Sequence, residues 1–411
     1  MLNFGNRFNT FSFLDSHHYD FQKSFECLAA IGNIDQVISR PGTFTLPSIN
    51  AFIQKHNDWI FGHLSYDLKN ELEELTSTNP DKIGFPEMFF FVPEIVIILN
   101  EYEVKIGIIS GNADEIYNQV ISEKNFSPGG SYTMELKSRL DKNEYLKKVY
   151  ILQDHIHKGD CYEINFCQEF YAQGVPISPM DVFIQLNNNS PNPFAAFYKL
   201  SDKFLLCASP ERYLKRLGDI ILSQPMKGTA ARNIHDPVQD QLRKESLIKS
   251  TKERSENIMI VDLVRNDLSK VCEEGSVHVD EFLGLYSFPQ VHQMISTIKG
   301  RVRRNASFSD IVAATFPMGS MTGAPKKKVM ELIEKYETTR RGLFSGAIGY
   351  IQPGGDFDFN VVIRSIQYNS LKNYISVMVG SAITFESNAE DEYQECLEKL
   401  GAMQQALRNK N

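Results

Sequence analysis

Short turns between consecutive strand-like runs are the feature that most constrains the fold of this chain. The stretch EIVIILNEYEVKIGIIS (94–110) reads as two β-branched strands joined near Asn100, and later strand candidates are separated by the turns PGGD and NSLKN. Antiparallel strands can be joined by such turns, whereas parallel strands need long crossovers. Because helices are mixed among these strands, the pattern favours a largely antiparallel α+β sandwich over a doubly wound parallel sheet.

Helix starts are marked by N-capping residues or by a proline in the first turn. The helix that begins at Asp236-Pro237 is expected to run on as one element towards NIMIVDL (257–263). The other predicted starts are Asp141, Pro325 and Ser387.

Pro128-Gly129-Gly130, within FSPGGSYT, is the best candidate boundary because it interrupts any regular element. It separates a strand-rich N-terminal part (1–130) from the rest of the chain (131–411). We expect both parts to belong to one intertwined body.

Charge and hydropathy exclude several classes of function. The 411 residues carry a formal net charge of −8, which argues against nucleic-acid binding because that needs a basic surface. The most apolar stretch, MFFFVPEIVIIL, is interrupted by Pro93 and Glu94 and is too short to span a bilayer. The six cysteines form no C-x-x-C pair, which suggests reduced thiols. We expect a soluble cytoplasmic protein with no nucleic-acid or membrane partner.

One lysine, Lys227, lies in a constrained turn, GDIILSQPMKGTAAR (218–232), between Pro225 and Gly228. A lysine in a loop is usually a solvated charge. Here the backbone on either side is held by proline and glycine, so the turn raises the question of what this amine does.

Two pairs of glutamates have i, i+3 spacing on predicted helices. Glu253 and Glu256 lie in KERSEN, and Glu392 and Glu395 lie in DEYQEC. Each pair projects from one helix face, and two facing pairs would form an all-oxygen site suited to Mg²⁺. The alternative is that each pair is an ordinary solvated helix face.

Three further positions have a structural and a functional interpretation. FNVVIRSIQY is expected to be one strand, with Arg364 on the same face as Val362 and Ile366, so Arg364 is either an edge residue that reaches water or a donor to a carboxylate in a pocket. Glu211, in ASPERYL, is either a turn residue or a general acid if burial raises its pKa. GSMTGAPK (319–326) fails the phosphate-loop pattern, so it is either a helix cap or a source of amide donors for an anion.

These segments, taken in order, resemble the chorismate-utilising enzymes, a family that includes anthranilate, aminodeoxychorismate, isochorismate and salicylate synthases. The resemblance extends over about residues 143–407. It rests on GDCYEINFCQ, SPERYL, PMKGT, ERSENIMIVDLVRNDL, FPMGSMTGAPK, RRGLFSGAIGY, VVIRS and DEYQE. It implies a sandwich of two large, mostly antiparallel β-sheets flanked by helices, with the active site between the lobes.

The resemblance also implies a Mg²⁺ site. Glu256 and Glu395 would be direct ligands, and Glu253 and Glu392 would act through water.

The same resemblance implies a substrate pocket for chorismate. Arg364 and Tyr350 would hold the enolpyruvyl carboxylate, and the backbone of Gly380-Ser381-Ala382 would lie near the carboxylates of the substrate. Thr322 would border the pocket, and Thr229 of the PMKGT turn would also contact the substrate.

Lys227 distinguishes branches of the family. The turn P-x-K-G-T resembles the branch that aminates chorismate at C4, whereas anthranilate-forming relatives carry a small residue in place of lysine. A neutral Lys227 would attack C2 while Glu211 protonates the departing C4 hydroxyl, and ammonia would then enter at C4. We expect burial in this tight turn to lower the pKa of Lys227.

No G-x-C-x-G nucleophile is present, so ammonia is expected from a separate glutamine amidotransferase subunit or from solution. The segment SPNPFAAF resembles one that borders a tryptophan pocket in the family, which raises tryptophan as a possible bound ligand. The family's histidine position holds Gln293, with His292 one residue earlier, so His292 is given no catalytic role.

The alternatives are anthranilate formation, isochorismate or salicylate formation, a non-catalytic regulatory homologue, and Mg²⁺-dependent phosphoryl transfer. Lys227 argues against the first, and Pro325 argues against the last because it spoils a phosphate cradle.

Overall fold

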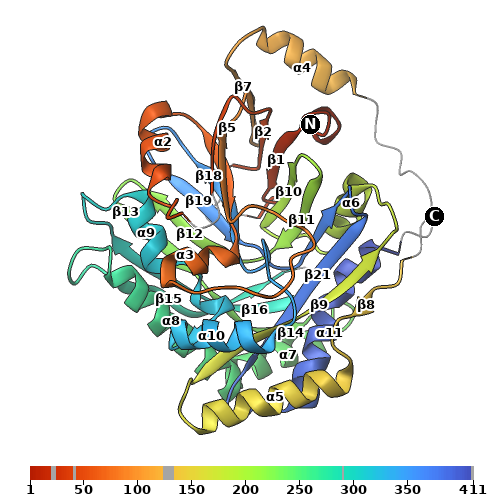
Figure 1. The fold of residues 1–411 in the computed structure, drawn as a ribbon, viewed down its shortest axis with the longest axis vertical. Helices are drawn as coiled ribbons and strands as arrows, with labels where there is room; N and C mark the ends of the chain where they lie inside the picture. The colour runs from red at the N-terminus through yellow and green to blue at the C-terminus, as the bar shows by residue number, and fades with distance from the viewer. Residues whose placement is uncertain (20–24, 40–42, 124–133, 289–290, 409–411) are drawn as a thin grey trace.

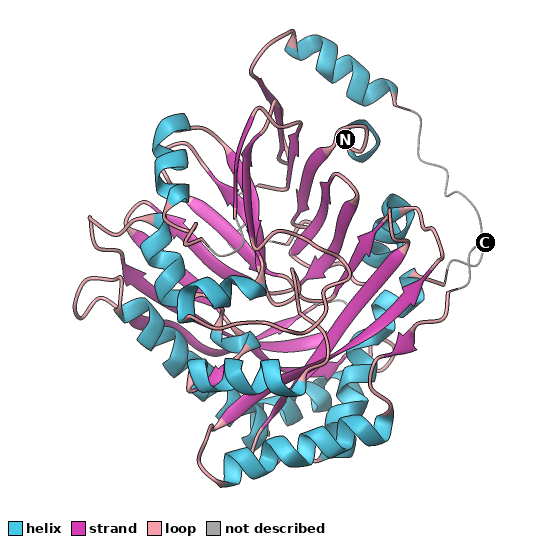
Figure 2. Ribbon diagram, viewed as in Figure 1, coloured by secondary structure: helices cyan, strands magenta, loops and turns pink. Residues whose placement is uncertain are grey.

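A computed structural model describes residues 1–19, 25–39, 43–123, 134–288 and 291–408. Two large β-sheets form its centre and helices lie around them (Figures 1 and 2). Every strand pairing found in the two sheets is antiparallel. The prediction of an α+β sandwich of two antiparallel sheets is therefore confirmed.

The first sheet, sheet A, has eleven strands. In spatial order they are β17 (Gly323–Ala324), β9 (Glu163–Gln173), β21 (Tyr374–Ile383), β20 (Ser365–Asn369), β11 (Lys203–Ser209), β10 (Phe194–Leu200), β1 (Thr10–Asp15), β2 (Cys27–Ile31), β6 (Ile95–Leu99) and β7 (Val104–Ile108), with β8 (Lys137–Ser138) paired to β9.

The second sheet, sheet B, has ten strands. In spatial order they are β14 (Met226–Ala231), β16 (Val291–Arg301), β13 (Ile220–Gln224), β12 (Arg212–Leu217), β19 (Phe357–Val361), β18 (Ala347–Ile351), β4 (Ile60–Leu64), β5 (Met88–Val92) and β3 (Asp35–Ile38), with β15 (His278–Ser287) paired to β16.

The helices pack mostly on the outer faces of the sheets (Figure 2). They are α1 (Leu2–Gly5), α2 (Ser48–His56), α3 (Lys69–Glu73), α4 (Ala113–Ser122), α5 (Lys142–His157), α6 (Pro179–Asn189), α7 (Pro237–Lys249), α8 (Thr251–Ser269), α9 (Phe308–Thr315), α10 (Lys326–Tyr336) and α11 (Ala389–Ala406), with single 3₁₀ turns at Tyr66–Leu68 and Gly319–Met321. None of these helices combines the length and apolar composition needed to cross a bilayer, within the described part of the chain.

Side-chain alternation along the strands divides the core into three layers. On β10, Phe197 faces the core shared with the helices of sheet A, while Ala196 and Tyr198 face the other way into an aromatic layer. On β5 of sheet B, Phe89 and Phe91 face that same layer. Successive strand residues point to opposite faces, so each sheet contributes to the central layer and to one outer layer.

The strands of residues 1–108 complete both sheets instead of forming a separate one. β1 pairs with β10 in sheet A, and β4 pairs with β18 in sheet B. The predicted boundary at Pro128-Gly129-Gly130 lies outside the described residues.

Most of the helix starts and turns predicted from local sequence signals are confirmed. Asp141 caps α5 in a capping box, and β6 and β7 form the expected hairpin. The helix predicted from Asp236 is wrong in its extent, because it breaks at Ser250 and α8 starts there with the Ser250 hydroxyl accepting from the Glu253 amide. The last helix is capped by Asn388 and not by Ser387.

The segment FNVVIRSIQY was expected to be one strand, and this is wrong. It forms the end of β19 in sheet B, a bend at residues 362–364, and β20 in sheet A. A second segment, Pro210 and Glu211, also passes from one sheet to the other, between β11 and β12. The two crossings lie side by side, since the Val361 amide donates to the Glu211 carbonyl and the Ala208 amide donates to the Arg364 carbonyl.

Candidate active site

A cavity of about 790 Å³ opens beside the two sheet crossings. Its volume is in the range that small-molecule sites occupy. Sheet A contributes β21, sheet B contributes β14 and β16, and α8 and α11 close it with charged side chains. Glu211, Lys227 and Arg364 all line this cavity.

Lys227 lies in a β-bulge of β14. Met226 pairs with Ile295 and Thr229 pairs with Gln293, so three steps along β14 match two along β16. Gly228, at φ +87°, supplies the left-handed backbone of the bulge. This extra residue explains the constrained backbone around Lys227: a bulge redirects a side chain, here into the cavity.

The amine of Lys227 is held by carboxylates. Its Nζ donates to Glu163 Oε1 at 2.9 Å and lies 3.8 Å from Glu256 Oε2, and the side chain is only 10% exposed. Burial alone would lower the pKa of Lys227, but Glu163, Glu256 and Glu395 outweigh burial and raise the pKa above the ordinary value of a lysine. The expectation that burial keeps this amine neutral is therefore wrong for the structure as it stands.

Glu211 is buried at the crossing between β11 and β12. The hydroxyl of Ser320 donates to its Oε1 at 2.7 Å. Burial raises the pKa of Glu211 to about 7, although Ser320 and Lys227 act to lower it. A carboxyl with that pKa carries its proton at neutral pH in an appreciable fraction of molecules, as a general acid requires.

The two glutamate pairs come from the first two turns of α8 and α11. Glu253, Glu256 and Glu395 line the cavity, whereas Glu392 does not. Glu253 and Glu256 follow the cap at Ser250, and Glu392 and Glu395 follow the cap at Asn388. We refer to these four side chains as the carboxylate cluster. Burial raises the pKa of Glu256 to about 8.

Two lysines, Lys252 and Lys399, contact these carboxylates. Lys252 Nζ donates to Glu392 Oε1 at 2.8 Å and lies 4.0 Å from Glu256 Oε1, so it joins the two helices. Lys399 Nζ lies 2.6 Å from Glu395 Oε1 and donates to the Gly380 carbonyl at 2.8 Å.

The donor set suits Mg²⁺ in its chemistry. Glu256 Oε1 and Glu392 Oε2 are buried without a hydrogen-bond partner in the described part of the chain. Hard carboxylate oxygens of this kind are what Mg²⁺ binds, with water completing its coordination. Within the described residues, no group of three or more acidic, histidine or cysteine side chains is already close enough together to enclose an ion.

Arg364 faces the cavity from the bend between β19 and β20, at φ +50°. In the described part of the chain, the Arg364 guanidinium makes no hydrogen bond or ion pair with another residue. Phe344 lines the same cavity. An unpaired guanidinium in such a cavity is suited to a small carboxylate-bearing ligand.

Some of the remaining predicted substrate contacts lie at the cavity and others lie away from it. Thr229, Gly380 and Ala382 line the cavity. Ser381 points the other way, with its hydroxyl 3.1 Å from the Tyr145 hydroxyl, because neighbouring residues on a strand face opposite sides. Thr322 is buried and donates to the Met318 carbonyl, so it is not part of the cavity wall.

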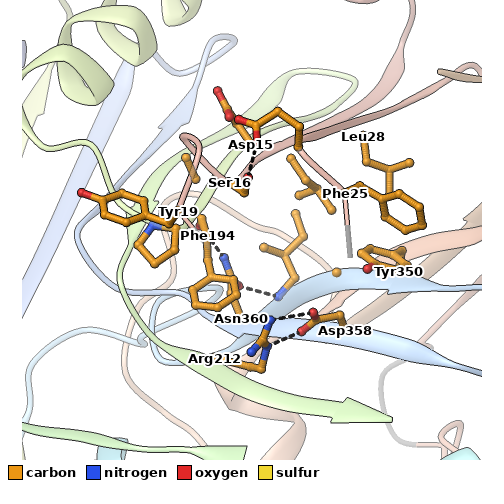
Figure 3. Close-up of a pocket in the computed structure, with 16 residues that line it drawn as sticks. Asp15, Ser16, Tyr19, Phe25, Leu28, Phe194, Arg212, Tyr350, Asp358 and Asn360 are labelled. Atoms are coloured by element: carbon orange, nitrogen blue, oxygen red, sulfur yellow. Dashed lines mark hydrogen bonds and ion pairs between the residues drawn. The ribbon is translucent and has the colours of Figure 1, made fainter. Parts of the chain in front are cut away.

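Tyr350 lies away from these residues, in a separate small pocket of about 70 Å³ (Figure 3). There its ring contacts Phe25, Trp59 and Phe61. The prediction that Tyr350 and Arg364 share a ligand is contradicted by this placement, because Tyr350 points into the aromatic layer between the sheets.

The small pocket, which we call the aromatic pocket, includes part of the segment SPNPFAAF. Phe194 lies over Arg212, whose guanidinium donates to both carboxylate oxygens of Asp358 at 2.9 and 3.1 Å (Figure 3). A tryptophan bound here stays a prediction from the sequence.

His292 and Gln293 lie on opposite faces of β16. Gln293 lines the cavity, whereas His292 is buried against Asp240 and Ser287, 3.1 and 2.8 Å from their oxygens. The His292 side chain therefore points away from the cavity.

Sequence reasoning missed Glu163 and the two lysines. Glu163 and Asn165 alternate on β9 with Ile164 and Phe166, which are in the core, so a polar face within an apolar strand was the available signal. Lys252 directly precedes Glu253, and Lys399 follows Glu395 by one helical turn.

Comparisons with known proteins agree with this geometry. Residues 18–405 match the model of a family described as chorismate binding enzyme. The chain is 33% identical to the aminodeoxychorismate synthase component 1 of Escherichia coli over 84% of its own length and 76% of that protein, and 35% identical to that of Salmonella typhimurium over 85% and 76%.

Among solved structures, anthranilate synthase component I from Streptococcus pneumoniae superposes with a TM-score of 0.81 at 26% identity, over 94% of each chain. The family match extends over nearly the whole length of the protein and includes every residue of the cavity described above. The chain belongs to the family of chorismate binding enzymes.

Proposed function

We propose that this protein transfers the nitrogen of ammonia to C4 of chorismate and forms 4-amino-4-deoxychorismate. The observation that carries the proposal is Lys227, an amine directed by a β-bulge into the same cavity as Glu211. The relatives named aminodeoxychorismate synthase component 1, at 33 and 35% identity, support this branch of the family.

The first half of the reaction forms a bond to the protein. Lys227 Nζ attacks C2 of chorismate, the ring double bond shifts, and the C4–oxygen bond breaks. Glu211 gives its proton to the departing oxygen, which leaves as water. Glu163, which accepts a hydrogen bond from Lys227 at 2.9 Å, is placed to take the proton that the ammonium must lose before it attacks.

The second half regenerates the lysine. Ammonia adds at C4 and gives up one proton, the double bond shifts back, and the C2–nitrogen bond to Lys227 breaks as one proton returns to the lysine nitrogen. Arg364 and the backbone at Gly380 and Ala382 would hold the carboxylates of the substrate during both halves.

Mg²⁺ is part of the proposal. Glu256 and Glu395 would bind it directly and Glu253 and Glu392 through water, and the bound ion would offset negative charge that develops on the ring carboxylate. Glu395→Gln is expected to shift the Mg²⁺ dependence of turnover to higher concentration. An unaltered Mg²⁺ titration would remove Glu395 from the ligand set.

The relatives are described as component 1 of their synthases. We therefore propose that a separate glutamine amidotransferase subunit supplies ammonia to this chain. The chain alone should then use ammonium salt but not glutamine.

The decisive experiment is product analysis. The purified protein is incubated with chorismate, MgCl₂ and ammonium chloride, and the products are separated by chromatography. The proposal expects 4-amino-4-deoxychorismate. Anthranilate as the product would overturn it in favour of amination at C2, which the structural relative from Streptococcus pneumoniae would suggest.

A second experiment tests the covalent step. Without ammonia, mass spectrometry of the protein after incubation with chorismate should find an adduct on Lys227, with a mass equal to that of chorismate less one water.

A further inference from the structure

Lys252 is the most solvent-accessible of the lysines that contact the carboxylate cluster. Its side chain is 35% exposed, whereas Lys227 is 10% exposed and Lys399 is 29% exposed. It lies in the first turn of α8, and its Nζ joins Glu392 on α11 to Glu256 on α8. A long, partly exposed side chain therefore places a positive charge between two buried carboxylates.

The carboxylates that Lys252 joins are not satisfied by it. Glu392 is 1% exposed and Glu256 is 8% exposed. Glu392 Oε2 and Glu256 Oε1 lack a hydrogen-bond partner among the described residues, even with the lysine in place. Buried carboxylate oxygens without donors are costly, so these two carboxylates can bind a stronger cation than the ammonium that is present.

We propose that Lys252 is an internal counter-ion, which occupies the position between Glu256 and Glu392 when no divalent cation is bound and moves out to solvent when Mg²⁺ enters. The inference rests on the Mg²⁺ site of the proposed function. An ammonium group brings one charge and three donors on a flexible stem, whereas Mg²⁺ would bring two charges to the same two carboxylates, to Glu256 directly and to Glu392 through water.

Geometry separates Lys252 from Lys227 in this role. Lys227 is fixed by the bulge of β14 and by its hydrogen bond to Glu163, so it has no comparable path to water. Lys252 needs only to rotate about its own side-chain bonds, because its side chain is already partly exposed to solvent.

The consequence is competition. A cation that must be displaced lowers the apparent affinity of the one that replaces it, because part of the binding free energy is spent on the displacement. Lys252 thus keeps the helices α8 and α11 joined without metal and makes Mg²⁺ binding weaker than the carboxylates alone would allow.

The test measures Mg²⁺ binding to the full chain by isothermal titration calorimetry, without chorismate. Lys252→Met removes the ammonium and keeps the length of the stem. Lys249→Met is the matched control, since Lys249 is 78% exposed on α7 and contacts only Glu245, at 3.8 Å, among described carboxylates.

The Lys252→Met protein is expected to bind Mg²⁺ about tenfold more tightly than the wild type, as loss of a competing charge-assisted hydrogen bond implies. The Lys249→Met protein should stay within about twofold of the wild type, because exposed charges are well screened. Equal or weaker binding by Lys252→Met would overturn the role proposed for Lys252 but not the metal site. Absence of Mg²⁺ binding in every protein would instead overturn the metal site of the proposed function, and this inference with it.

A second measurement uses the wild-type chain, so it tests the proposal even if the Lys252→Met protein does not fold. Lysines are acetylated briefly with and without Mg²⁺, and the labelling of each is quantified by mass spectrometry. Lys252 should be labelled several-fold faster with Mg²⁺, while Lys249 should not change. Equal labelling of Lys252 in both conditions would contradict its movement to solvent.

Discussion

Buried charges are paired in the aromatic pocket but left partly unpaired at the active-site cavity. In the aromatic pocket, Arg212 meets Asp358 with two hydrogen bonds, and Lys215 lies 4.0 Å from the same carboxylate. In the active-site cavity, Arg364 has no such partner among the described residues, and Glu256 keeps an oxygen without a hydrogen-bond partner. The same holds for an oxygen of Glu392, which is buried next to the cavity and is joined to Glu256 by Lys252.

This difference shows which cavity is arranged for a ligand. Breaking or omitting a partner for a buried charge costs stability, so unpaired groups persist where something else binds them. The volumes agree, at about 790 Å³ for the active-site cavity and about 70 Å³ for the aromatic pocket. The aromatic pocket therefore stabilises the contact between the sheets, whereas the larger cavity can hold chorismate.

The largest effect is expected at Lys227 in the active-site cavity, and Lys215, which lies beside Asp358 of the aromatic pocket, is its control. Lys227→Ala should lower kcat by at least about a thousandfold, since loss of a covalent nucleophile removes the reaction path itself. Lys215→Ala, at a lysine of almost equal burial (11% against 10% exposed), should keep the kcat of the folded protein. Steady-state product formation with ammonium chloride measures both. Normal turnover by Lys227→Ala would show that no covalent intermediate is needed.

Glu211→Gln is expected to lower kcat by about a hundredfold to a thousandfold, the range found for loss of a general acid. In the wild type, burial raises the pKa of Glu211 to about 7. Because the acid acts while protonated, kcat/KM should fall as pH rises above about 7 and should not fall from this cause below it.

A profile of kcat/KM from pH 6 to 9 checks the assignment of Glu211. The variant should lose the alkaline limb, since glutamine does not titrate. A limb that persists unchanged in Glu211→Gln would assign the titration to another group.

The arginines give the next effect. Arg364→Met should raise KM for chorismate by about tenfold to a hundredfold, because a charge-assisted hydrogen bond to a carboxylate is lost. Arg212→Met should leave KM unchanged and instead lower the free energy of unfolding by about 3–5 kcal/mol, since it strands Asp358. Initial-rate kinetics and urea unfolding separate the two outcomes. A KM effect at Arg212 would mean that the aromatic pocket communicates with the substrate.

Local signals predicted most of the fold. The capping box at Asp141 and the hairpin at 95–108 depend only on residues within a few positions of each other, and both formed as expected. The crossing at Arg364 could not be predicted in this way. FNVVIRSIQY stays apolar into the bend, with Val361, Val362 and Ile363 in a row, and nothing local shows that β19 and β20 belong to different sheets.

The site was predictable in its residue types but not in its electrostatics. Glu211, Lys227 and Arg364 were identified from motifs, and the structure brings them to one cavity. The pKa of Lys227 depends on Glu163, which is 64 residues away in sequence and contacts it only through the pairing of β9 into the sheet. Because this charge comes from a distant strand, the residues of the turn around Lys227 do not indicate it.

The smallest effect is expected at Tyr350, where sequence and structure disagree. Its ring lies among Phe25, Trp59 and Phe61 in the aromatic pocket, and not beside Arg364. Tyr350→Phe should therefore change kcat and KM for chorismate by less than about twofold, while loss of its hydroxyl costs about 1 kcal/mol of stability. Phe344→Ala is the matched comparison, because Phe344 does line the active-site cavity and its truncation should raise KM. If Tyr350→Phe raised KM tenfold with kcat intact, Tyr350 would contact the substrate carboxylate after all, and the two cavities would have to act as one.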